Sequence, residues 1–284
     1  MDWVDSRNVA YRVLDNPEEL DSLVCKYVAY LYLKNGGSSG KSVAQTLISA
    51  IGAASLKMRG KLLVAAKMSA GWSKLVPSVA HPPMLWDLAL VVAYQLKRAG
   101  KHSAALVVLL SFDCLLRISE VLSLVKEDVA VASDPRLSGF KKVSVRIRHA
   151  KGGNNQWVVV SHPDVSRLLV DLVVSLPSNS SSLFSLSESQ YRTLFKGVCS
   201  NLGLHASFVP HSLRHGSATQ MYINGVGMAE IKKRGRWKQS STVDHYIQQG
   251  PAIAMQHEVK PAYAALGQRI SQVVYGIFSL SQGH

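Results

Sequence analysis

Apolar residues recur at helical spacing over the first quarter of the chain. A helix is predicted to begin at Pro17, with Asn16 able to cap its first turn. The apolar positions that follow fit one face of this helix: Leu23, Tyr27, Tyr30 and Leu31. Two further helices are predicted, over about Ser42–Ala54 and Gly60–Met68. The segment from Pro77 to Pro83 contains three prolines, which do not fit a helix interior, and it indicates an interdomain linker.

The helical pattern resumes after this linker. An amphipathic helix is predicted over Trp86–Arg98 and is expected to end at Gly100. A strongly apolar helix is predicted over His102–Cys114. Four more helices are predicted farther along the chain, near Val165–Ser175, Ser187–Leu202, His211–Ile223 and Met228–Arg234.

A β-hairpin is predicted between these helices. Val143, Val145 and Ile147 alternate with polar residues, which is typical of a half-buried strand. A turn rich in Gly and Asn over 151–155 comes next, and Trp157–Val160 supplies the second strand. The pattern therefore predicts a mainly α fold with a small antiparallel β-sheet. It is organised as a helical domain over 1–76, a linker over 77–83 and a second domain over 84–284.

The charge balance narrows the class of partner. Lys and Arg number 32 against 18 Asp and Glu, which gives a formal net charge of +14. A protein this basic commonly binds a polyanion, above all nucleic acid, although a basic protein with no special partner is the alternative. The three cysteines are far apart and suggest neither a zinc site nor a disulfide framework. The longest apolar run, Ala104–Leu110, is too short to cross a bilayer, so no membrane partner is expected.

His211 and Arg214 are candidate anion-binding residues. Pro210 places His211 near a helix N-terminus, and Arg214 lies one turn later on the same face. The helix dipole favours an anion at that end, and a guanidinium with an imidazole can clamp a phosphate. Taken alone, the same pair also fits a solvated surface.

Arg117 is a second candidate because it stands among apolar residues. A charge in such surroundings is costly unless it is paired, and Glu120, one turn on, can hold it. The functional interpretation is an arginine held ready for a phosphate, and the alternative is a simple intrahelical ion pair.

Three further residues are ordinary when each is taken alone. Lys151 occupies the predicted hairpin turn, where a solvated lysine is common, although the two glycines after it permit close approach to a ligand. Trp237 fits core packing, and Tyr246 near the C-terminus carries no signal of its own.

The order of these candidate residues along the chain is informative, because it resembles the ordered set of catalytic residues in the tyrosine recombinases. The set is Arg117, Lys151, His211, Arg214, Trp237 and Tyr246. The resemblance extends from about residue 17 to about residue 250. The segment Gly235-Arg236-Trp237 is similar to the corresponding segment in recombinases of eukaryotic mobile elements. Trp237 occupies a position where many members of the family have histidine. The matching segments are Leu116–Glu120, His149–Gly153, Pro210–Thr219, Gly235–Trp237 and Tyr246.

The resemblance implies a fold and a chemistry. The first domain corresponds to a core-binding domain, which forms a C-shaped clamp around DNA with the catalytic domain. Tyr246 is implied to attack the scissile phosphate, giving a 3′-phosphotyrosine and a free 5′-hydroxyl without metal, nucleotide or other cofactor. Arg117 and Arg214 are implied to stabilise the charge on the phosphate oxygens.

The remaining roles follow from the same resemblance. His211 is implied to accept the tyrosine proton, Lys151 to protonate the leaving oxygen, and Trp237 to hydrogen-bond a phosphate oxygen. Glu120 supports Arg117. The residues expected to contact DNA backbone phosphates are Lys57, Arg59, Lys61, Lys232, Lys233, Arg236 and Lys238.

The expected partner is double-stranded DNA, bound by a homotetramer on paired sites. The expected location is the nucleus of a eukaryote or the cytoplasm of a bacterium. A type IB topoisomerase shares this chemistry, and a catalytically idle DNA-binding protein is an alternative from another class. Comparing activity on supercoiled plasmid with activity on paired target sites distinguishes a recombinase from a topoisomerase. A trapped covalent complex with DNA distinguishes an enzyme from an idle DNA-binding protein.

An apolar stripe close to the C-terminus suggests a docking element. Gly250 and Pro251 interrupt the chain after Tyr246. The stripe is expected to dock on a neighbouring protomer, as in the resembled family, and the alternative is packing on its own domain. Its members are Ala264, Leu266, Ile270, Val273, Val274 and Ile277.

Overall fold

The chain divides into two compact units, Met1–Ala80 and His81–His284. The division lies inside the segment 77–83 that the sequence predicts as a linker. The computed structural model describes residues 13, 15–34, 36–76, 81–131, 142–150, 153–239, 243–244, 246–247 and 260–279.

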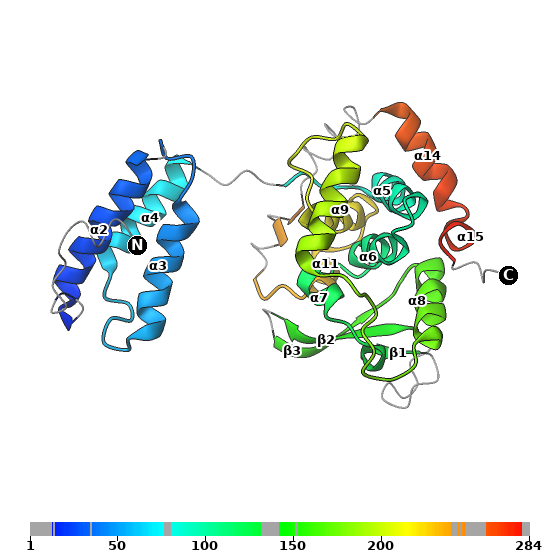
Figure 1. The fold of residues 1–284 in the computed structure, drawn as a ribbon, viewed down its shortest axis with the longest axis horizontal. Coiled ribbons are helices and arrows are strands. Elements are labelled where there is room, and N and C mark those ends of the chain that lie inside the picture. The colour runs from blue at the N-terminus through cyan, green and yellow to red at the C-terminus, as the bar shows by residue number, and fades with distance from the viewer. Residues whose placement is uncertain are drawn as a thin grey trace. The chain divides into compact units, whose positions relative to one another are not determined.

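The first unit is built on three helices, α2 (Pro17–Lys34), α3 (Lys41–Ala54) and α4 (Leu63–Leu75) (Figure 1). The side-chain oxygen of Asn16 accepts the backbone N–H of Glu18 at 3.0 Å, which confirms the predicted cap. The core of this unit consists of Leu20, Val24, Val28, Leu31, Ala44, Met58, Leu62, Ala65 and Trp72.

The third helix begins later than the sequence predicts. Gly60 has a left-handed φ of +73°, which a helix interior does not admit, and α4 starts only at Leu63. The buried carboxylate of Asp21 accepts the N–H groups of Val64 and Ala65, both at 2.9 Å, and so caps the new start. The capping residue lies on another helix and far away in sequence, so no local pattern announces it.

The second unit is mainly helical, as predicted. The apolar pair α5 (Trp86–Arg98) and α6 (His102–Asp113) lies in its core. Around this pair lie α7 (Ile118–Leu122), a 3₁₀ turn at Lys126–Asp128, α8 (Pro163–Ser175), α9 (Glu188–Asn201), α10 (His211–Ile223), α11 (Met228–Gly235), α14 (Pro261–Ser271) and α15 (Val274–Phe278) (Figure 1).

A three-stranded antiparallel sheet accompanies these helices, in the order β1-β2-β3. Its strands are β1 (Val129–Ala130), β2 (Ser144–Ala150) and β3 (Gly153–Val159). The predicted hairpin is confirmed, and Val145 pairs with Val158. The predicted turn over 151–155 is too long, because Gly153 already pairs with Ala150. The short strand β1 is not predicted from the sequence.

The apolar stripe near the C-terminus packs on its own unit, which corrects the expectation that it needs a neighbouring protomer. Ile270, Val274 and Phe278 are buried in the core that α5 and α6 share. Val273 is 53% exposed, because the helix breaks between α14 and α15. None of the helices in the described part of the chain is both long and apolar enough to span a membrane.

Candidate active site

Helix α10 carries two of the predicted site residues at its start. His211 is its first residue, and Arg214 follows one turn later. The Nε2 atom of His211 lies 3.0 Å from the phenolic oxygen of Tyr246, and Tyr246 as a whole residue is only 9% exposed. The structure therefore brings a potential proton acceptor to the hydroxyl of the predicted nucleophile.

Arg214 is completely buried, and it lies against two aromatic rings. Its Cζ atom lies 4.7 Å from the centre of the Trp237 ring and 5.5 Å from that of Tyr246. Its terminal nitrogens donate to the carbonyl oxygens of Leu115 and, at 2.5 Å, of Gly235. Its Nε atom has no hydrogen-bond partner within the described structure. Cation–π contacts and carbonyl groups thus hold this guanidinium.

The charge of Arg214 is not neutralised by a direct contact. Among the described residues, no carboxylate lies within ion-pair distance of its guanidinium. Burial lowers the pKa of Arg214, and the charges of Arg236 and Arg117 lower it further. A buried cation without a carboxylate partner is costly, so this site favours the arrival of an anion.

The carbonyl group of Leu115 organises the link between α6 and α7. Leu115 is buried and has a φ of +48°, a left-handed conformation that costs a non-glycine residue roughly 1–3 kcal/mol. Its oxygen accepts hydrogen bonds from both Arg214 and Arg236. The strained residue thus presents its carbonyl oxygen to two arginines.

Arg117 and Glu120 form the predicted pair at the start of α7. The guanidinium of Arg117 donates to Oε1 of Glu120 at 2.6 Å, and its backbone N–H donates to Oε2 at 2.9 Å. The Arg117 side chain is 27% exposed, whereas that of Glu120 is 3% exposed. Arg117 is therefore anchored at its base and still reaches solvent.

Glu120 is held as a carboxylate by its neighbours. Burial alone would raise the pKa of its carboxyl group, but the charges of Arg236, Arg214 and Arg117 and the N–H of Arg117 outweigh burial and lower it. Three guanidinium groups thus act on one carboxylate, which leaves the cluster with more positive than negative charge. Such a cluster can neutralise an added phosphate.

Arg236 corrects the prediction that assigned it to the exposed basic surface. Its side chain is 5% exposed and donates to Oε2 of Glu120 at 2.7 Å. Lys233 and Lys238 are exposed, Lys232 is half-buried, and Lys57, Arg59 and Lys61 are exposed in the loop between α3 and α4 of the first unit. Lys151 lies outside the described residues.

Tyr246 is positioned by groups from α10 and by Trp237. The hydroxyl of Thr219 donates to its backbone carbonyl at 3.2 Å. The ring of His215 stacks on the tyrosine ring with centres 4.4 Å apart, and the Trp237 ring lies at 4.6 Å. The buried indole nitrogen of Trp237 has no partner in the described structure. His215 is thus a neighbour of Tyr246 that no sequence pattern indicates.

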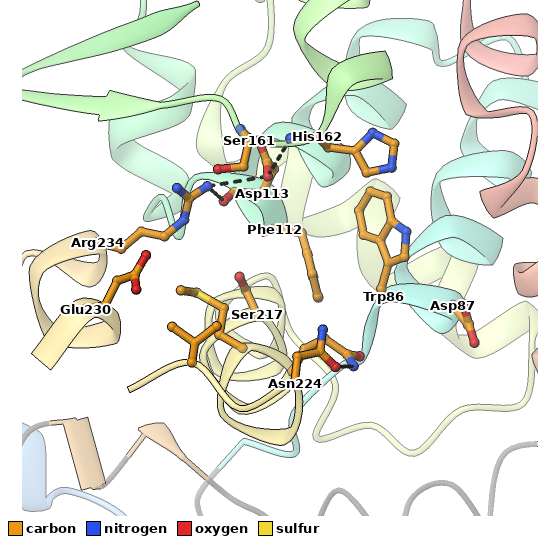
Figure 2. Close-up of a pocket in the computed structure, with 13 residues that line it drawn as sticks. Trp86, Asp87, Phe112, Asp113, Ser161, His162, Ser217, Asn224, Glu230 and Arg234 are labelled. Atoms are coloured by element: carbon orange, nitrogen blue, oxygen red, sulfur yellow. Dashed lines mark hydrogen bonds and ion pairs between the residues drawn. The ribbon is translucent and has the colours of Figure 1, made fainter. Parts of the chain in front are cut away.

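A cavity lies beside this cluster, and none of the described catalytic candidates lines it. It has a volume of about 490 Å³ and is lined by residues that include Trp86, Phe112 and Glu230 (Figure 2). At its wall, Arg234 donates to the backbone oxygen of Asp113 at 2.6 Å, and the Asp113 carboxylate accepts the N–H of Ser161 at 2.8 Å. These contacts fix the end of α6, two residues before Leu115.

Comparisons with known proteins identify the second unit. The sequence model of the phage integrase family matches residues 89–252. The fold is similar to that of the Tn1549 transposon integrase in complex with circular intermediate DNA, at a TM-score of 0.56 and 10% identity, over 91% of this chain and 97% of that one. A variant of that integrase in a similar complex gives a TM-score of 0.53 at 12% identity, over 90% and 96%. No curated protein matched the sequence.

Proposed function

The chain belongs to the phage integrase family of tyrosine recombinases, and from that premise we propose that it cleaves and rejoins double-stranded DNA at specific sites through Tyr246. The observation that carries this proposal is the cluster around the tyrosine. The phenolic oxygen of Tyr246 lies 3.0 Å from Nε2 of His211. The Tyr246 ring lies over Arg214, a buried arginine that no carboxylate of the described residues contacts.

The reaction would be a transesterification. The phenolic oxygen of Tyr246 forms a bond to the scissile phosphorus, and the bond from phosphorus to the 5′-oxygen of the next nucleotide breaks. The tyrosine proton passes to Nε2 of His211, and the 5′-oxygen takes a proton from Lys151. The phosphodiester energy is retained in the 3′-phosphotyrosine link. Attack by a 5′-hydroxyl reverses the step and rejoins a strand.

The arginines and the tryptophan would bind the phosphate itself. Arg117 is anchored by Glu120 and partly exposed, so its remaining donors can meet a non-bridging oxygen. Arg214 Nε and Trp237 Nε1 are buried donors without partners, and each can serve an oxygen on which negative charge develops. These donors are in place before the reaction, so little reorganisation is needed.

Double-stranded DNA is the proposed partner because two observations agree on it. The Tn1549 integrase structures contain DNA, and the net charge of this chain is +14. We propose that exposed or half-buried lysines and arginines of both units contact backbone phosphates, and that a homotetramer binds paired sites. The first unit would serve as the core-binding domain. The candidate residues for phosphate contact are Lys57, Arg59, Lys61, Lys232, Lys233 and Lys238.

Recombination and simple relaxation give different products from a supercoiled plasmid. The target sequence is first recovered by sequencing DNA that stays covalently attached to the denatured protein. A plasmid with two directly repeated copies of that sequence is then expected to yield two smaller circles, whereas a plasmid with one copy yields none. Relaxation of plasmids that lack the sequence would instead favour a type IB topoisomerase.

Replacing Lys151 with alanine is expected to slow cleavage by a factor that depends on the leaving group. An alkoxide needs a proton as it leaves, and loss of a general acid typically costs roughly 10²–10⁴-fold. A 5′-bridging sulfur leaves without protonation, so the Lys151→Ala variant should cleave that substrate at close to the wild-type rate. Single-turnover rates on the two substrates measure the difference. Equal slowing of both would make Lys151 a phosphate contact only.

A further inference from the structure

Arg236 turns back into the second unit directly after α11. It adopts a left-handed conformation with a φ of +58°, which ends the helix and changes the direction of the chain. Its side chain is 5% exposed, although α11 is otherwise rich in exposed and half-buried basic residues. A basic side chain this deeply buried contributes little to an exposed DNA-binding surface.

The guanidinium of Arg236 bridges segments that are far apart in sequence. One terminal nitrogen donates to Oε2 of Glu120 at 2.7 Å and to the carbonyl oxygen of Leu115 at 3.2 Å. The other donates to the carbonyl oxygen of Cys114 at 3.3 Å. Cys114 and Leu115 lie in the link between α6 and α7, and Glu120 lies on α7. One planar group thus holds the backbone of that link and a carboxylate of α7 together.

The Glu120 carboxylate and the Leu115 carbonyl, which Arg236 contacts, each also hold an arginine that we propose binds the phosphate. The second oxygen of Glu120 accepts from Arg117 at 2.6 Å. The carbonyl oxygen of Leu115 accepts from Arg214. A shift of Glu120 would therefore release Arg117, and a shift of Leu115 would release Arg214. Arg236 is one hydrogen bond removed from each.

We propose that Arg236 is a positioning residue for DNA cleavage, which fixes Glu120 and the Leu115 carbonyl so that Arg117 and Arg214 are aligned on the scissile phosphate. This inference rests on the proposed function. Arg236 does not touch DNA; it acts through the two acceptors that it shares. Holding the Leu115 carbonyl as well as the Glu120 carboxylate requires an arginine, because a lysine amine lacks the rigid planar group that directs its N–H bonds at fixed angles.

The test compares Arg236→Lys and Arg236→Gln with the wild-type full-length chain on a duplex carrying the recovered cleavage site. Arg236→Lys keeps the positive charge beside Glu120 and provides a folded variant if Arg236→Gln unfolds. At saturating protein, we expect Arg236→Lys to cleave roughly 100-fold more slowly, the scale on which small misplacements of catalytic groups register. The dissociation constant for DNA should stay close to the wild-type value.

A second substrate separates positioning from a general loss of structure. A methylphosphonate at the scissile position removes one charged oxygen, so it depends less on aligned guanidinium groups. The defect of Arg236→Lys should therefore be markedly smaller on the methylphosphonate than on the phosphodiester. Arg192→Gln removes an arginine from an exposed ion pair on α9 and should match the wild type on both substrates.

The outcomes distinguish this inference from the function on which it rests. Wild-type rates in both Arg236 variants, or equal slowing on the two substrates, would overturn the positioning role while leaving the recombinase proposal intact. A wild-type protein that forms no covalent adduct with DNA would overturn both.

Discussion

Replacing Gly216 with alanine is expected to destabilise the second unit by about 3 kcal/mol or more, since even modest overpacking of a core costs 1–3 kcal/mol. A Cβ atom at this position of α10 would lie 1.7 Å from the carbonyl oxygen of Met84 and 2.4 Å from its carbonyl carbon. Both are backbone atoms, so no side-chain rotation relieves the overlap. Met84 is itself completely buried and donates its N–H to the carbonyl of Ser212 at 2.9 Å.

The expected consequence reaches the active site because Gly216 lies two residues after Arg214. Helix α10 and the segment before α5 would have to move apart, and a shift of α10 would also displace Arg214 on that helix. A loss of 3 kcal/mol corresponds to a fall in melting temperature of roughly 6–12 °C for a unit of about 200 residues. Thermal unfolding of the full-length variant measures this shift.

Gly197→Ala is the matched control for this substitution. Gly197 lies inside α9, and a Cβ atom there would meet nothing within 4 Å. Alanine favours a helix interior over glycine by roughly 0.5–1 kcal/mol, so this variant should be as stable as the wild type or more stable. A Gly216→Ala protein that melts at the wild-type temperature would show that Met84 does not pack against α10 in this way.

The helices that carry the site were predictable because local signals agree there. Pro210 and the apolar pattern after it give the start and end of α10, and the structure confirms His211–Ile223. Trp86–Arg98 is likewise confirmed, with Gly100 in the left-handed conformation beyond its end. The pairing of Arg117 with Glu120 could be predicted because the two residues are three positions apart.

The buried position of Arg236 could not be predicted from its neighbours in sequence. Four residues within four positions of it are basic, which indicates a solvated surface, and its carboxylate partner is 116 positions away. The left-handed conformation of Leu115 could not be predicted either, because leucine has no preference for it. Long-range hydrogen bonds of this kind depend on how α6, α7 and α11 pack, and a sequence pattern does not contain that information.

The C-terminal stripe shows a different limit. Periodicity correctly indicates that one face of this segment is apolar, but it does not say which surface covers it. In the structure, Ile270 and Val274 are buried against their own unit, and a Cβ atom on Gly267 would lie 2.4 Å from the backbone oxygen of Asp87. The close approach of α14 to α5 therefore depends on a glycine that a hydrophobic pattern does not single out.

Replacing Tyr246 with phenylalanine is expected to abolish strand cleavage and to leave DNA binding nearly intact. The substitution removes the phenolic oxygen that would attack phosphorus and keeps the ring that packs on His215 and Trp237. Loss of a covalent nucleophile lowers a rate by roughly 10⁴-fold or more. The lost hydrogen bond to His211 should cost only about 1 kcal/mol of stability.

Tyr191→Phe is the matched control for that variant. Tyr191 is another buried tyrosine of the same unit, on α9, and its hydroxyl has no hydrogen-bond partner in the described structure. Removing this hydroxyl should change neither cleavage nor binding. Filter binding to the recovered target duplex and denaturing gels of the reaction products compare the two variants with the wild type.

The most direct measurement of the central claim is the mass of the Tyr246 peptide after reaction with DNA. The protein is denatured during cleavage, the attached DNA is digested with nuclease, and the peptides are analysed by mass spectrometry. The account predicts a nucleotide joined through its 3′-phosphate to Tyr246 in the wild type and in Tyr191→Phe, and no adduct in Tyr246→Phe. An adduct on another residue, or one that persists in Tyr246→Phe, would contradict it.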